Sequence, residues 1–447
     1  MKVYLTNWKI KDPVEAISHA ALTCYQDQMP GWGKKINVET ALFKTGHHTT
    51  IQHVDFTFFI DGISVGDVTF GLHLANPFYD TSQRSGRFCA KMFSNPDYLK
   101  ILEYLNFWSL SYDQREKVLD YVKLAIGIYS ANIQKATDRA DEFIRIERPN
   151  ASEKYRQQNA PKIAQEQLRM SVPIIFPTAL EYTINLSVLT AMYRAAWTPV
   201  LKEVTGQMAN LVKGKWPELS FLFTERDEED ISLQFTSGCK KYKGFLAKPE
   251  LTLISAGNAV WFVKPEPQDL HPIDLLHFLP KYMENNVEEI KTEVEISVAT
   301  MGQDQRHRTI RRGRPRWTGN FYLPPILDSL GLGKETFEIF EQWVKISRNL
   351  PISLATTLAP YGAMVKYEKS ASYNAAIHEL GKRLCWCAQE EIYHLARSLQ
   401  NQLDASSPLQ GMFSVACVVS GKCGEGNRYC GRDLKKMQED PFPERLI

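Results

Sequence analysis

The chain has 447 residues, of which 44% are hydrophobic and 11% aromatic, enough to build two or three globular domains. Its formal net charge of +2 predicts no overall attraction to nucleic acid or membrane, so any anion binding must come from local clusters. No apolar run reaches the ~18 residues that a membrane-spanning helix needs, and the first residues resemble neither a signal peptide nor a transit peptide. We therefore expect a cytoplasmic protein.

The first half predicts one strand followed mainly by helices. In segment 55–64, Phe56, Phe58 and Ile60 alternate with residues of the other face, which predicts a strand. A short helix is expected over 65–74, before Pro77, and a polar loop over 78–87. Longer helical stretches are expected at 98–148, 161–169 and 179–213.

The periodic pattern fades between Gly214 and Gly244, which indicates a domain boundary. Beyond it, β-branched and aromatic residues predict a strand over 251–263. A second strand is expected within 288–301, where Val294, Ile296 and Val298 alternate. A helical stretch over 370–403 completes this half.

The most distinctive motif is the triplet Arg306-His307-Arg308, with Gln303 three residues before it. This cluster is typical of an anion-binding site, although such a triplet often lies on a solvated basic face. A third interpretation is a patch for single-stranded nucleic acid, because further arginines and a tryptophan follow at Arg311, Arg312, Arg314, Arg316 and Trp317.

A series of short motifs in the first half resembles the flavin-dependent thymidylate synthase family. The motifs are His47-His48-Thr49-Thr50-Ile51-Gln52-His53, Phe56-Thr57-Phe58, Leu72-His73-Leu74, Ser82-Gln83-Arg84 and Glu166-Gln167-Leu168-Arg169. Two departures are clear, because Gln52 stands in place of the family's glutamate and Leu72-His73-Leu74 in place of its Arg-His-Arg triplet. Arg194 falls at the position of the family's catalytic arginine, but a surface salt bridge is an equally good interpretation of it.

The second half resembles the same family at the complementary places. Gln303 with the Arg306-His307-Arg308 triplet is similar to the family's Gln-x-x-Arg-His-Arg, and Arg383 with Gln389 and Glu391 is similar to its Arg-x5-Gln-x-Glu. Other positions differ, with Arg316, Thr318 and Thr356 replacing the family's serine and two arginines. Asn185 and Arg194 in the first half, and Asn374 and Arg383 in the second, share one spacing, which predicts a divergent tandem repeat.

The resemblance implies an α+β fold of two tandem units, each a small sheet packed with helices. The expected division is a first unit over 1–222 with a helical insertion at about 95–150, a linker over 223–250, and a second unit over 251–447. Since the family's active sites lie between subunits, the two halves would share one composite site. A dimer of such chains would supply the four units of the family's tetramer.

The resemblance also implies a reaction, in which dUMP is methylated to dTMP with FAD, methylenetetrahydrofolate and NADPH. Arg383 would be catalytic, and the substrate would be bound by Ser82, Arg84, Arg169, Gln303 and Arg306. FAD would contact Thr49, His53, Asp80, Arg306, His307 and Arg308. Two alternatives remain at this stage: another flavin-dependent enzyme that modifies pyrimidine C5, such as a hydroxymethylase, or a non-catalytic nucleic-acid-binding derivative.

The cysteines cluster near the C-terminus. Cys417, Cys423 and Cys430 lie in a glycine-rich stretch that is compatible with a zinc knuckle, with Cys385 or Cys387 as a further ligand. Reduced, metal-free thiols are an equally good interpretation. The nearby histidines His47, His48 and His53 lack a companion carboxylate or thiol, so we do not predict a metal there.

Overall fold

The structure is a computed structural model. It describes residues 1–7, 11–28, 30–74, 78–86, 89, 91–226, 245–257, 263, 280–406, 413–415, 417–418, 421–424, 426, 429–435 and 445–447. Within these residues, no helix combines the length and apolar character that crossing a membrane requires. Most of the predicted linker, residues 227–244, lies outside the described residues.

The first half forms a four-stranded antiparallel sheet in the order β1-β2-β4-β3. The strands are β1 (Lys2–Asn7), β2 (Asp55–Ser64), β3 (Tyr79–Gln83) and β4 (Pro177–Asn185). The predicted strand at 55–64 is confirmed as β2, and Phe56, Phe58 and Ile60 are buried as its alternation requires.

Two sequence predictions in this half are wrong. Residues 79–83 form the edge strand β3 and not a loop, because their backbone pairs with β4. Residues 179–185 form part of β4 and not of a helix. Leu180, Tyr182 and Ile184 are all buried on one face, and the expected helix begins only after Asn185, whose side chain caps it.

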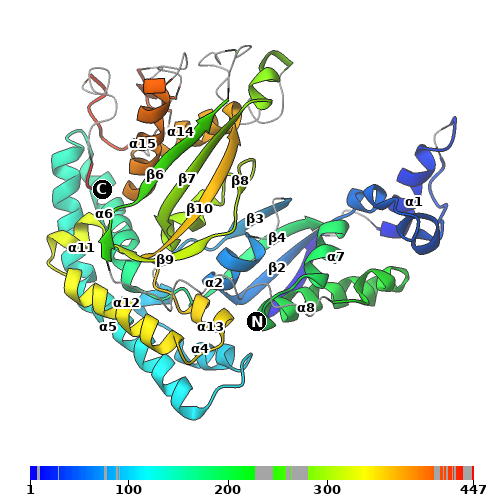
Figure 1. Cartoon of the computed structure of the whole chain (residues 1–447), viewed down its shortest axis with the longest axis horizontal. Coiled ribbons are helices and arrows are strands. Elements are labelled where there is room, and N and C mark those ends of the chain that lie inside the picture. The colour runs from blue at the N-terminus through cyan, green and yellow to red at the C-terminus, as the bar shows by residue number, and fades with distance from the viewer. Residues whose placement is uncertain are drawn as a thin grey trace.

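Helices cover this sheet and extend away from it (Figure 1). They are α1 (Pro13–Thr23), η1 (Glu39–Phe43), η2 (His48–His53), α2 (Val65–Asp67), η3 (Val68–Leu72), α3 (Lys91–Ser94), α4 (Tyr98–Leu105), α5 (Tyr112–Glu147), α6 (Glu153–Leu168), η4 (Arg169–Ser171), α7 (Leu186–Arg194), α8 (Pro199–Lys215) and η5 (Pro217–Phe223). The 36-residue α5 begins at a capping box formed by Ser111 and Gln114.

The second half contains a sheet with a related order, β5-β9-β10-β7-β6, and β8 also pairs with β10. Its strands are β5 (Phe245–Ala247), β6 (Glu250–Ala256), β7 (Glu289–Ser297), β8 (Arg311–Arg312), β9 (Arg316–Tyr322) and β10 (Ala363–Ser372). Its helices are η9 (Pro280–Tyr282), η10 (Glu284–Asn286), α10 (Val298–Asp304), α11 (Pro325–Ser329), α12 (Gly333–Ser347), α13 (Ile352–Thr357), α14 (Tyr373–Arg383) and α15 (Glu390–Ser406). The chain is therefore an α+β protein with two small sheets, as predicted.

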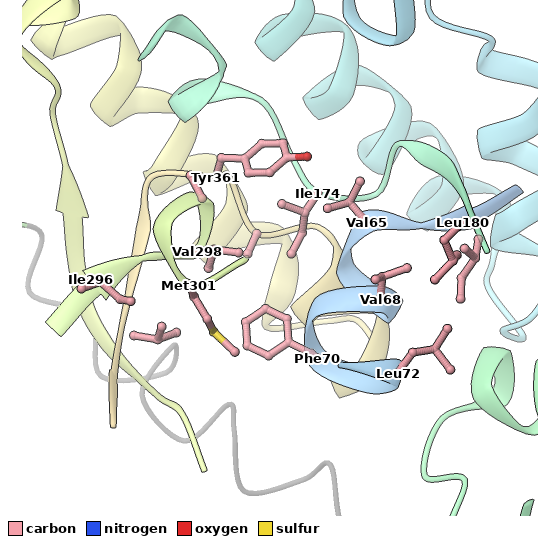
Figure 2. Packing of buried hydrophobic residues seen from close by; sticks show 14 of the residues in the cluster. Val65, Val68, Phe70, Leu72, Ile174, Leu180, Ile296, Val298, Met301 and Tyr361 are labelled. Atoms are coloured by element: carbon pink, nitrogen blue, oxygen red, sulfur yellow. The ribbon is translucent and has the colours of Figure 1, made fainter. Parts of the chain in front are cut away.

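The two halves share one hydrophobic core. At their junction, Pro173 and Pro360 lie opposite each other in an antiparallel bridge, and the amide N–H of Tyr361 donates to the carbonyl of Val172 at 2.9 Å. Figure 2 shows Phe70 of η3 beside Met301 of α10, so the short helices that follow β2 and β7 meet in this core. Packing across the junction fixes the loops after both helices relative to each other.

Candidate active site

The Arg306-His307-Arg308 triplet lies in a loop directly after α10. That helix begins at Ser297, whose hydroxyl accepts from the amide N–H of Thr300 at 3.2 Å. It ends at Asp304, so the triplet leaves the helix and turns toward the first half of the chain. The helix therefore serves as the rigid base of the triplet.

A buried charge network holds this loop in place. The carboxylate of Asp304 accepts from Lys369 Nζ at 2.6 Å and from the Tyr367 hydroxyl at 2.8 Å, and it pairs with Arg312. Lys369 also pairs with Glu379 at 2.8 Å, so two cations balance two anions. Burial alone would raise the pKa of Asp304, but Arg312 and Lys369 hold it well below its ordinary value.

Arg312 ties the network to the backbone of the triplet. Its guanidinium donates to the carbonyls of His307 at 3.0 Å and Ile310 at 2.8 Å. Arg312 is therefore a structural residue. Trp317 is also buried, packing against Phe70 and Trp343 with ring centroids 5.3 and 5.0 Å away. The predicted stacking platform for single-stranded nucleic acid is therefore wrong, because a buried tryptophan cannot stack on a base.

The triplet contacts the first half of the chain directly. Arg308 Nη1 donates to Asp80 Oδ1 at 2.9 Å, and its Nη2 lies 3.4 Å from the carbonyl oxygen of Thr81. The same guanidinium lies 4.9 Å from the centroid of the Tyr79 ring. These contacts join the loop after α10 to the edge strand β3.

An open cavity of about 460 Å³ lies between the two halves at this contact. From the first half it is lined by Asp55, Phe78, Tyr79, Asp80, Thr183, Ile184 and Asn185, and from the second by Arg306, His307, Arg308, Thr309 and His378. All three triplet residues therefore line one cavity that neither half forms alone.

The electrostatics of the triplet favour an anion beside a neutral imidazole. The pKa of His307 lies well below its ordinary value, first because the ring is buried and then because Arg383 and His378 lie near it. Arg306 is exposed to the cavity, yet partial burial lowers its pKa, and Arg169 and Arg308 lower it further. His307 is thus uncharged at neutral pH, whereas several arginines repel one another around the cavity.

Arg169, from the first half, is buried at the C-terminal end of α6. Its guanidinium lies 4.8 Å from the centroid of the Tyr361 ring, which belongs to the second half. A Cβ placed on Gly86 would lie only 2.9 Å from Arg169 Nη1, so the absence of a side chain at Gly86 leaves room for this arginine. Among the described residues, no hydrogen-bond partner is present for the buried Nε of Arg169.

Gln303 and Arg383 lie next to each other. Arg383, the last residue of α14, donates from Nη2 to the carbonyl oxygen of Gln303 at 2.6 Å. The amide of Gln303 contacts Gln389 and lies 3.5 Å from Glu166 Oε1 of the first half. Arg383 Nε is also buried without a partner within the described part of the chain.

Ser82 and Arg84 are placed by β3. Residues 80, 82 and 84 share one face of this strand. All three are exposed, and Arg84 continues the pairing, since its amide N–H donates to the carbonyl of Ala179 at 2.8 Å. Because Asp80 contacts Arg308, Ser82 and Arg84 lie on the strand face that meets the triplet.

Thr49 and His53 are exposed on η2, which runs into β2. Asp55, two residues after His53, lines the cavity, so η2 approaches its rim. The structure gives no contact between these two side chains and the triplet.

The structure separates Arg194 from Arg383, although both end the helix that follows a central strand. Arg194 is exposed and lies 3.7 Å from Glu225, also exposed, in a surface ion pair. This geometry favours the salt-bridge interpretation of Arg194.

The sequence analysis missed His378, Lys369 and Glu379. The His378 ring lies 5.3 Å from that of His307 in an edge-on arrangement, and Lys369 and Glu379 complete the buried network. A signal was available only for the last pair, because a lysine and a glutamate ten residues apart span a strand end and the following helix.

The cysteine-rich tail does not form a metal centre in this structure. Among the described residues, no group of three or more His, Cys, Asp or Glu side chains could hold a metal ion. Cys417, Cys423 and Cys430 belong to the described residues and are free thiols, so the predicted zinc knuckle is not supported. Burial raises the pKa of the Cys417 thiol to about 11, and the nearby Cys385 raises it further.

Comparison with known proteins assigns the first half to a family. The family model of the thymidylate synthase complementing protein matches residues 5–218. Residues 5–218 belong to this family. The match spans β1 to η5, including the strand β3 and the buried Arg169. It ends before the triplet, so Arg306 to Arg308 lie outside the matched part of the chain.

A crystal structure of Thymidylate Synthase X (ThyX) from Helicobacter pylori with FAD and dUMP is similar at 13% sequence identity. The alignment covers 50% of this chain and 100% of that chain, with a TM-score of 0.30. No curated protein matches the chain significantly.

Proposed function

We propose that this protein is a flavin-dependent thymidylate synthase with one composite active site per chain. It would methylate dUMP at C5, taking the one-carbon unit from methylenetetrahydrofolate and reducing equivalents from NADPH. Family membership of residues 5–218 supports the reaction class. The observation that carries the composite site is the cavity lined by β3 of the first half and the Arg306-His307-Arg308 triplet of the second.

The residues around the cavity fit FAD. Its diphosphate is an anion, and Arg306 is exposed in the cavity with only Arg169 and Arg308 as the nearby charges that shift its pKa. An anion would relieve this repulsion. Arg306, His307 and Arg308 would hold FAD together with Asp80, while Thr49 and His53 would contact it from η2. When bound, the flavin supplies the hydride that reduces the transferred one-carbon unit.

The nucleotide would lie next to the flavin, where the arginines converge. The phosphate of dUMP is a dianion, and Arg84 and Arg169 can grip it with bidentate, charge-assisted hydrogen bonds. Ser82 and Arg306 would add further donors. The unpartnered Nε of buried Arg169 supports this assignment, since an anion would satisfy it.

Arg383 would act on the pyrimidine ring. Its Nη2 is fixed by the carbonyl of Gln303, while its Nε has no partner among the described residues. A cation held in this way stabilises negative charge that develops on the ring as C5 becomes nucleophilic. Gln303 would orient the uracil through its side-chain amide, which Gln389 and Glu166 hold in place.

The domain organisation belongs to the same proposal. We infer two tandem units, 1–222 and 251–447, with the helical insertion at about 95–150, because the central strands follow the same order in both sheets. β1, β2, β4 and β3 would correspond to β6, β7, β10 and β9. Two such chains would form a dimer equivalent to four units.

The test is to purify the full chain and assay it. We expect a yellow protein with flavin absorbance that converts dUMP to dTMP with methylenetetrahydrofolate and NADPH, as followed by mass spectrometry. A hydroxymethylated product would instead identify a related C5-modifying enzyme, and a colourless protein without turnover would contradict the proposal.

A matched pair of variants tests the composite site. Arg383→Ala should lower kcat by at least about 100-fold, because an electrostatic contact to the reacting ring is lost. Arg194→Ala, at the corresponding end of α7, should leave kcat within about twofold, since Arg194 makes only an exposed ion pair. Equal effects of the two variants would show that the second half does not supply the catalytic arginine.

A further inference from the structure

A second cavity of about 300 Å³ lies next to the candidate active site. It is lined by His73, Tyr79, Gln305 and Arg308, together with the apolar side chains of Leu74 and Met301 and further residues of the 310–315 loop. Tyr79 and Arg308 line both cavities and therefore form the wall between them. The volume is at the lower end of ligand-binding pockets, which suits one ring or two fused rings.

The charges around this second cavity are already balanced. Arg308 pairs with Asp80 at 2.9 Å, Arg312 with Asp304, and Arg311 with Glu289. Each arginine in the lining thus has a carboxylate partner. A further anion would gain little here, so the cavity favours a neutral ligand, unlike the cavity around Arg306.

Three polar atoms of the lining are buried without a hydrogen-bond partner among the described residues: His73 Nε2, Gln305 Oε1 and Arg308 Nε. Gln305 is only 4% exposed, and its Nε2 already donates to the carbonyl of Thr69 at 2.9 Å. Its orientation is therefore fixed, with Oε1 as an unused acceptor. Arg308 Nε–H is an unused donor.

The walls of the cavity suit a planar ring. The His73 ring is stacked on Tyr79 with centroids 4.9 Å apart and planes 6° from parallel. Burial lowers the pKa of His73 to about 3, and Arg308 and Arg306 lower it further, so the imidazole is neutral and can both donate and accept. The apolar side chains of Leu74, Met301 and Ile310 contribute the remaining surface.

We propose that this cavity is a second binding site, which takes a neutral planar heterocycle with a lactam edge, as in uracil or hypoxanthine. The ring N–H would donate to Gln305 Oε1, and the ring carbonyl would accept from Arg308 Nε–H, with His73 contacting a further polar atom of the ring. Through the shared wall, occupancy of this site acts on the position of Arg308 and so on the neighbouring cavity.

The experiment is a calorimetric titration of the purified full chain with uracil and, separately, with hypoxanthine. The control ligand is 1,3-dimethyluracil, which has the same ring but no N–H. We expect at least one of the two lactams to bind at least about tenfold more tightly than the dimethylated compound. The titration needs neither flavin nor dUMP, so its result is independent of the proposed thymidylate synthesis.

Three variants locate the binding. Leu74→Trp should abolish it by filling the cavity, whereas Leu74→Met should leave it within about threefold. His73→Phe keeps the stack on Tyr79 but removes both ring nitrogens, and should weaken binding about fivefold. Near-ultraviolet circular dichroism and thermal unfolding verify that each variant is folded.

Three results would overturn the proposal. The first is no binding of either lactam by the folded wild-type chain at millimolar concentration. The second is equal affinity for 1,3-dimethyluracil, which would reduce the site to an apolar hollow. The third is lactam binding that a folded Leu74→Trp variant retains, which would place the ligand elsewhere.

Discussion

Arg308 of the second half donates to Asp80 of the first at 2.9 Å, across 228 positions of sequence. Asp80 is highly exposed, with a side-chain exposure of 84%, so this ion pair by itself adds little stability. Its importance is geometric. It holds the triplet against the face of β3 that also carries Ser82 and Arg84, and so defines where a nucleotide and a flavin would meet.

The first prediction concerns flavin binding by Arg308. Arg308→Ala should lower the affinity for FAD at least about tenfold, because one charge-assisted contact to the cofactor is lost. Arg311→Ala is the matched control, since Arg311 is exposed and pairs with Glu289 on the other side of the loop. Flavin content after gel filtration and fluorescence titration measure both. If both variants retain flavin equally, Arg308 does not hold the cofactor.

The second prediction concerns the buried network beneath the triplet. Asp304→Asn should destabilise the protein by about 3–5 kcal/mol, because Lys369 and Arg312 lose the carboxylate that balances them. Glu293→Gln, which removes an exposed partner of Lys366, should cost less than about 1 kcal/mol. Urea unfolding monitored by fluorescence compares the two. Similar midpoints for both variants would contradict the structural role of Asp304.

The third prediction is a pH dependence of stability that arises from Asp67. Burial raises the pKa of this carboxyl to about 6, although hydrogen bonds from Ser64 and Tyr104 oppose the rise. Between about pH 4 and pH 6 the folded state therefore binds more protons at Asp67 than the unfolded state does. This contribution to stability is present at low pH and is lost as the pH rises, by about 3 kcal/mol in total.

Replacing the carboxyl should remove this dependence. Asp67→Asn should flatten the slope of unfolding free energy against pH between 4 and 6, relative to the wild type. Asp113→Asn, at an exposed position of α5, is the control and should preserve the slope. Denaturant unfolding at several pH values gives the measurement. An unchanged slope in Asp67→Asn would show that this carboxyl does not titrate in the window.

The fourth prediction tests the close approach of the two halves. A Cβ on Gly66 would lie 2.9 Å from the backbone Cα of Thr357, so Gly66→Ala should destabilise the protein by about 1–3 kcal/mol. A Cβ on Gly302 of α10 would meet no atom within 4 Å, and Gly302→Ala should be neutral or stabilising by up to about 1 kcal/mol. Thermal unfolding distinguishes them. A neutral Gly66→Ala would mean that the junction is looser than the structure shows.

Local patterns predicted the elements whose residues face one core. The alternation of Phe56, Phe58 and Ile60 correctly placed β2, and the polar and apolar periodicity of α5 correctly placed the long helix. The errors fell on β3 and β4. β3 is a short edge strand with polar residues on its open face, and its pairing with β4 is a long-range contact that a local pattern does not carry.

The same division holds for the candidate site. The sequence by itself determined the residue types: an Arg-His-Arg triplet, a Ser-x-Arg motif and two further arginines, Arg169 and Arg383, whose chemistry suits anions. Only the tertiary structure decided which of these meet. It joined Arg308 to Asp80, buried Arg312 in an ion-pair network, and left Arg194 at the surface. The reason is physical, since the charge and shape of a site depend on distances between elements that packing of the shared core brings together.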